Sequence, residues 1–148
     1  MGGKMRTASW VLLALLAAMT GLASLGSAWV ALSGTEDQFG VEGPTLAEVT
    51  ESHPEVAPAI RARRLTAASY ALGYSVLLLA ITLGPYRAGK RWAWWAILAA
   101  FLLPGAVSLL RVPLLGTELG ASTVLVQLVV VGVALALDAR RLVGSADS

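Results

Sequence analysis

The chain has 148 residues, of which 57% are hydrophobic and only 14% are charged, and its mean hydropathy is +0.73. This composition is far more apolar than that of an ordinary soluble domain, so it indicates a membrane protein. The absence of cysteine excludes disulfides, iron–sulfur clusters and thiol redox chemistry, and the single histidine, His53, excludes a multi-histidine metal or haem site within one chain.

Four stretches without a charged side chain are each long enough to cross a bilayer, because about 20 apolar residues at about 1.5 Å per residue span a hydrocarbon core of roughly 30 Å. They occupy about residues 10–32, 65–85, 92–110 and 119–137, with an outer loop at 33–64. Short connections force neighbouring helices to run antiparallel. The sequence therefore predicts an all-α membrane protein, a single domain over residues 1–148. We expect a four-transmembrane-helix antiparallel bundle with a short amphipathic helix in the first outer loop.

The segments between these spans divide the charges unequally. One side carries seven basic and two acidic residues, which are Lys4, Arg6, Arg87, Lys90, Arg91, Arg140, Arg141, Asp138 and Asp147; the other side carries four basic and seven acidic residues. The positive-inside bias then places both termini and the loop 86–91 in the cytoplasm. We expect a multi-pass protein of the bacterial cell (inner) membrane.

The first span has two interpretations. Lys4 and Arg6 before an apolar run, followed by Gly26-Ser27-Ala28, are also typical of a cleaved secretory signal. We favour a retained helix because the apolar stretch continues to Leu32 and because one helical face carries only small side chains. That face comprises Ala14, Ala17, Gly21, Ser24, Ala28 and Ala31.

The second span has a similar line of small residues, namely Thr66, Ser69, Gly73, Ala80 and Gly84. Lipid supplies no hydrophobic force between helices, so close contact over small residues is their main source of attraction. We therefore expect the two faces to pack together with a left-handed crossing of around +20°. Within this packing, Ser69 and Gly73 face the small residues of the first span.

Residues 84–90 read GPYRAGK and fit the phosphate-loop pattern G-x-x-x-x-G-K. A true phosphate loop follows a β-strand and has Ser or Thr after the lysine, whereas here a membrane helix precedes it and Arg91 follows. We therefore interpret the segment as a cytoplasmic turn in which Gly84-Pro85 ends a helix. Trp92, Trp94 and Trp95 then lie at the level of the lipid headgroups.

Pro104 lies inside the third span, where its ring removes a backbone donor and predicts a kink. Between the midplane and the outer surface, the spans also carry polar residues that would line a cavity for a lipid, a quinone or another lipophilic molecule. These candidate ligand-binding residues are Tyr70, Tyr74, Ser108, Arg111, Thr123 and Gln127. The favoured alternative is that they form hydrogen bonds between helices, each contributing about 0.6 kcal/mol.

In the outer loop, Thr45-Leu-Ala-Glu48 is a capping-box pattern that predicts a helix from Leu46 to about Ser52. Its amphipathic character would let it lie flat over the helix ends. Glu48, Glu51, His53 and Glu55 do not have the spacing of a recognised metal site, so a solvated acidic face is favoured and no metal ligand is predicted.

The sequence Pro85-Tyr86-Arg87-x-Gly89-x-Arg91-Trp92-Ala93-Trp94 resembles the turn between the second and third helices of small, uncharacterised bacterial four-helix integral membrane proteins. The resemblance covers about the middle third of the chain and implies an architecture without an activity. In size and helix number the chain is also similar to small multidrug exporters, but their proton-coupling carboxylate has no counterpart in the first span. Four-helix thiol oxidases require the cysteines that this chain lacks.

Two functional hypotheses remain, and neither involves a catalytic residue, a cofactor or nucleic acid. The first, which we favour, is an assembly or accessory protein that acts by helix packing in a homo-oligomer or with another membrane protein. The second is a binder or carrier of a lipophilic molecule in the outer-half cavity. An enzyme ranks third, because the acidic residues have no evident catalytic partner.

Overall fold

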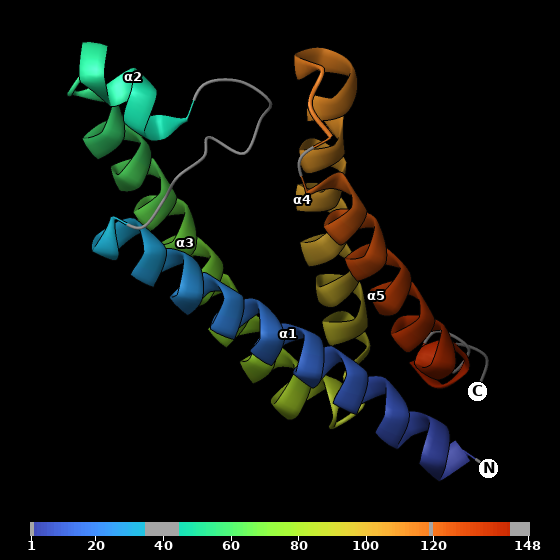
Figure 1. Ribbon diagram of the computed structural model, residues 1–148. Coiled ribbons are helices and arrows are strands. Elements are labelled where there is room, and N and C mark those ends of the chain that lie inside the picture. Colours follow the sequence, from blue (N-terminus) through green and yellow to red (C-terminus); the bar gives the residue numbers. More distant parts are fainter. Residues whose placement is uncertain (1, 35–44, 119, 143–148) are drawn as a thin grey trace. The chain divides into compact units, whose positions relative to one another are not determined.

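The computed structural model of the chain describes residues 2–34, 45–118 and 120–142, all of which belong to helices or to the turns beside them (Figure 1). The elements are α1 (Gly2–Ser33), α2 (Leu46–Ser52), α3 (Val56–Ile81), the π-helical segment η1 (Thr82–Tyr86), α4 (Arg91–Leu115) and α5 (Ala121–Leu142). Four helical stretches in this part of the chain are long and apolar enough to cross a membrane: Thr7–Ser33, Val56–Tyr86, Arg91–Leu115 and Ala121–Ala139. The predicted all-α class with four apolar spans is confirmed.

Two helices extend beyond the spans expected from the sequence, because charges marked the expected ends of the spans and helices do not end at a charge. α3 begins at Val56, before the span expected at about 65–85, and so includes Arg61, Arg63 and Arg64. α4 continues past Arg111 to Leu115 and ends at Gly116, whose φ of 65° is left-handed. Glycine adopts this conformation without steric cost, so it ends a helix where an arginine does not.

The end of α3 also differs from the expected stop at Gly84-Pro85. Pro85 has no N–H group and cannot donate to the carbonyl of Ile81 one turn earlier. The backbone widens into η1, where the N–H of Arg87 donates to the carbonyl of Thr82 at 3.1 Å. The turn to α4 then passes through Gly89, which has a φ of 87°.

The short helix α2 begins with a reciprocal pair of hydrogen bonds. The hydroxyl of Thr45 accepts from the N–H of Glu48 at 3.3 Å, and the Glu48 carboxylate accepts from the N–H of Thr45 at 2.6 Å. Each side chain therefore satisfies a backbone donor that the helix itself cannot pair. The position of α2 over the other helix ends stays a prediction, and residues 35–44 of the expected outer loop lie outside the described residues.

The chain forms two compact units, which we describe separately. Unit 1 comprises the residues before Met19 together with those from Leu77 onward, and unit 2 comprises Met19–Val76. In unit 1, α4 and α5 lie side by side as an antiparallel hairpin (Figure 1). In unit 2, α1 and α3 are also antiparallel, since Gly21 faces Ser75 while Ser27 contacts Arg64.

Candidate functional site

Unit 1 contains a buried polar cluster centred on Ser9. Its hydroxyl lies 2.6 Å from the hydroxyl of Tyr86 and donates to the carbonyl of Ala134 at 2.7 Å. Ser9 and Tyr86 have no exposed surface, and the cluster joins α1, η1 and α5. A backbone carbonyl of α5 thereby gains a second hydrogen bond, so the cluster fixes the rotation of α5 relative to the other two elements.

Further polar groups surround this cluster. The indole N–H of Trp94 donates to the carbonyl of Leu135 at 3.1 Å, and the guanidinium of Arg87 lies 4.9 Å from the centre of a Trp10 ring. Asp138 is buried with 3% of its surface exposed. The sequence interpretation missed this site, because it assigned Asp138 to an exposed segment after the last span and treated the aromatic residues as headgroup anchors.

The predicted helix-packing residues take different positions. On α1, Ala17, Gly21 and Ser24 are buried, whereas Ala14 and Ala28 are half-buried. On α3, Ser69 and Gly73 are exposed, and a Cβ added at Gly73 would meet no atom within 4 Å. Ser75 is the residue opposite Gly21, where an added Cβ would lie only 2.7 Å from the serine Oγ.

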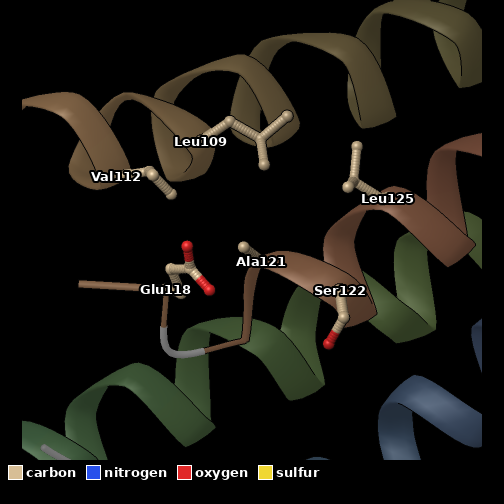
Figure 2. A pocket seen from close by; sticks show the side chains of 6 residues that line it. All are labelled: Leu109, Val112, Glu118, Ala121, Ser122 and Leu125. Carbon is tan, nitrogen blue, oxygen red and sulfur yellow. The ribbon is translucent and has the colours of Figure 1, made fainter. Parts of the chain in front are cut away.

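A pocket of about 510 Å³ opens between the last turns of α4 and the first turns of α5 (Figure 2). It is lined by Leu109, Val112, Glu118, Ala121, Ser122 and Leu125. In Figure 2, Leu109 and Val112 extend from α4 toward the space, the Glu118 carboxylate stands beside Ala121, and the Ser122 hydroxyl points away. The pocket therefore combines aliphatic walls with one carboxylate.

Local backbone chemistry produces the turn that closes this pocket. Gly116 and Gly120 both have left-handed φ angles, of 65° and 71°. The N–H of Gly116 donates to the carbonyl of Val112 at 3.1 Å, and the N–H of Ala121 donates to the carbonyl of Glu118 at 2.9 Å. These bonds end α4, begin α5 and hold the Glu118 backbone beside the pocket.

None of the six predicted ligand-binding residues lines this pocket. Ser108, Arg111, Thr123 and Gln127 belong to the same α4–α5 hairpin, whereas Tyr70 and Tyr74 belong to unit 2. Tyr70 and Thr123 are exposed, and the other four residues are half-buried. The ligand-binding residues were predicted from polar side chains alone, so the aliphatic walls of the pocket at Leu109, Val112 and Leu125 were missed. Ligand binding by the six residues stays a prediction.

Arg111 and Glu118 lie close to each other in sequence but do not pair. The Nε of Arg111 is buried without a hydrogen-bond partner, and one terminal nitrogen of its guanidinium lies 3.0 Å from the position of a Cβ added at Gly120. No salt bridge joins Arg111 to Glu118 in the part of the chain that the structure describes. The two opposite charges at the α4–α5 turn are thus held apart.

The acidic residues around α2 do not gather into a metal site in the part of the chain that the structure describes, where no group of three His, Cys, Asp or Glu side chains is suitable for an ion. His53 and Glu55 form an exposed pair at 3.5 Å.

No protein-family model matches this chain, and comparisons with curated proteins and with solved structures found no match.

Proposed function

We propose that this protein is a membrane-integral binder of a lipophilic molecule, which it holds in the pocket between α4 and α5. The observation that supports the proposal is the pocket itself, a space of about 510 Å³ with aliphatic walls and one carboxylate. Small-molecule sites typically combine apolar walls with a few polar groups that orient the ligand. Because both helices are candidate membrane spans, such a ligand can enter from the bilayer without crossing water.

The proposal includes the arrangement of the chain in the membrane. The four spans form one antiparallel bundle in a bacterial inner membrane, with both termini in the cytoplasm. The unequal division of basic residues supports this orientation. The pocket, which adjoins the turn between α4 and α5, then lies near the outer surface.

Native mass spectrometry of the full-length protein in mild detergent tests the binding function. We expect the wild type to retain a discrete small molecule and Ala121→Phe, which fills the pocket, to lose it. Leu110→Phe is the matched control, because Leu110 is exposed on α4 and does not line the pocket. A wild type without any added mass, or equal retention by Ala121→Phe, would contradict the proposal.

A second candidate function is assembly with another membrane helix through α3. The small residues Thr66, Ser69 and Gly73 of α3 are all exposed, and a Cβ added at Gly73 would meet nothing within 4 Å. Small side chains permit the close backbone approach on which helix association in lipid depends. This face therefore has room for a helix of a second copy or of another membrane protein.

The mass of the complex distinguishes assembly from a monomeric binder. Gly73→Leu should dissociate an oligomer or a co-purifying partner, because its side chain prevents close approach. Gly26→Leu is the matched control on α1, where an added Cβ also meets nothing within 4 Å. A wild type that is monomeric and free of partners would exclude this second function.

A further inference from the structure

The turn between α4 and α5 carries two opposite charges, Arg111 and Glu118, that do not pair with each other. Among the described residues, the side chains of Arg111 and Glu118 form no hydrogen bond and no ion pair, and the Nε of Arg111 is buried. A buried donor without a partner is destabilising, and such groups are rare in native structures. A ligand that supplied an anion to Arg111 would remove this cost, and a cation on the same ligand would pair with the exposed carboxylate of Glu118.

The surroundings of the two charges restrict the ligand further. Glu118 shares the pocket with Leu109, Val112, Ala121 and Leu125, so a molecule at the carboxylate also contacts aliphatic side chains. Arg111 directly precedes Val112, which lines the pocket, and its guanidinium reaches the turn at Gly120. The site therefore combines a place for a hydrocarbon chain with two separated charges at the end of a membrane hairpin, where headgroups lie.

We infer that the ligand of this pocket is a zwitterionic phospholipid whose headgroup carries a primary ammonium, as in phosphatidylethanolamine. The inference depends on the proposed binding function. The phosphate accepts hydrogen bonds from the guanidinium of Arg111, whose planar donors suit phosphate oxygens. The ammonium donates to the carboxylate of Glu118, and part of one acyl chain lies between Leu109 and Leu125.

This assignment predicts an order of preference among lipids. Phosphatidylcholine has the same charges, but its quaternary ammonium has no N–H group to donate to Glu118. Phosphatidylglycerol can satisfy Arg111 but supplies no cation for Glu118, so it leaves the carboxylate unpaired. We expect phosphatidylethanolamine to bind more tightly than either, by about tenfold or more, since charge-assisted hydrogen bonds are the stronger kind.

The test is a titration of delipidated full-length protein with the three lipids, all carrying the same acyl chains, read out by native mass spectrometry. Glu118→Gln should remove the preference for phosphatidylethanolamine over phosphatidylcholine. Arg111→Gln should weaken binding of all three lipids. Glu51→Gln and Arg63→Gln are the matched controls, because both residues are exposed and lie outside the pocket. Unchanged melting temperatures establish that the variants are folded.

The outcomes separate this inference from the proposed function. Equal binding of the three lipids that is unaffected by Glu118→Gln but abolished by Ala121→Phe would overturn the headgroup assignment and leave a lipophilic pocket. Binding that persists in Ala121→Phe would place the lipid elsewhere and contradict both. Preference for phosphatidylethanolamine that is lost in Glu118→Gln and in Ala121→Phe supports both.

Discussion

The hydroxyl oxygens of Ser9 and Tyr86 lie 2.6 Å apart, and both side chains are completely buried. Serine has one hydroxyl proton, which Ser9 donates to the carbonyl of Ala134. The Ser9 hydroxyl therefore takes part in two hydrogen bonds at once, and it links α1 to η1 through Tyr86 and to α5 through Ala134.

Ser9→Ala should destabilise the protein, because it removes the bond to the Tyr86 hydroxyl and the bond to the carbonyl of Ala134. Such bonds in membrane proteins contribute about 0.6 kcal/mol on average and at most about 1.7 kcal/mol each. Thermal unfolding in detergent measures the loss. Ser69→Ala is the control, since the Ser69 hydroxyl is exposed and donates to the carbonyl of Thr66 in its own helix. Equal melting temperatures of Ser9→Ala and Ser69→Ala would contradict a stabilising role of the buried cluster.

Gly21→Ala should lower the free energy of unfolding by about 1–3 kcal/mol, the usual range for overpacking. The added Cβ would lie 2.7 Å from the Oγ of Ser75, which is buried. Gly26→Ala is the matched control on the same helix, because its Cβ would meet open space. Denaturation of the two variants, measured in the same detergent, checks the expectation.

The double variant Gly21→Ala/Ser75→Ala should recover part of the lost stability, because it removes the oxygen that the new methyl group meets. A double-mutant cycle reports this coupling directly. Additive effects of the two substitutions would show that Gly21 and Ser75 do not approach each other in solution.

The capping box of α2 should weaken in acid. The backbone N–H of Thr45, and then its hydroxyl, hold the pKa of Glu48 below its ordinary value of 4.5. Because the folded-state pKa is the lower one, the ionised carboxylate stabilises α2 above about pH 4.5. That contribution is lost as the pH falls through the folded-state value.

Amide exchange at Thr45 and Glu48, followed from about pH 6 to about pH 3, measures this loss. Glu48→Gln keeps a neutral acceptor at the same position and should make the protection independent of pH in this range. Glu51→Gln should retain the wild-type dependence. If protection in the wild type stays constant down to about pH 3, the carboxylate does not cap the helix.

Arg87→Gln should lower the free energy of unfolding by about 0.5–1 kcal/mol, because Arg87 is exposed and its guanidinium lies 4.9 Å from the centre of a Trp10 ring. Arg87→Lys should retain part of the effect. Arg87→Gln should lower the free energy of unfolding less in the Trp10→Leu background than in the wild type. The melting temperatures of Arg87→Gln, Arg87→Lys, Trp10→Leu and the double variant Trp10→Leu/Arg87→Gln measure this difference. An equal cost in both backgrounds would assign the role of Arg87 to its other contacts.

The apolar spans could be predicted from sequence because transfer of a helix from water into lipid depends mainly on the side chains of one continuous stretch, which the sequence shows directly. The π-helical segment at Pro85 could not be predicted in this way. Pro85 has no N–H group, and several backbone conformations can provide other donors for the nearby carbonyls with the same sequence pattern. The small face of α1 contains Gly21, which does approach α3, but its opposite residue Ser75 lay off the expected line of α3. Which face of a helix meets its neighbour depends on the packing of whole helices.

The pocket likewise has features that could be predicted from the sequence and features that could not. Glu118 and Arg111 could be placed near the turn of the α4–α5 hairpin from sequence, because charges flank the apolar spans. The aliphatic walls could not, because Leu109 and Leu125 are indistinguishable from lipid-facing leucines until the two helices have been brought together. Asp138 was missed for the opposite reason, since burial of an acidic group depends on the polar neighbours that surround it.

The structure of η1 depends on the number of residues in this segment as well as on their side chains. Successive helical residues are rotated by about 100°, so one residue more or fewer turns every later side chain to a new direction. A deletion of Leu83 could restore a regular helix locally, yet it would carry the Tyr86 hydroxyl away from Ser9. Homologous chains that keep this tyrosine contact should therefore conserve the spacing between Thr82 and Tyr86 even where the residues between them vary.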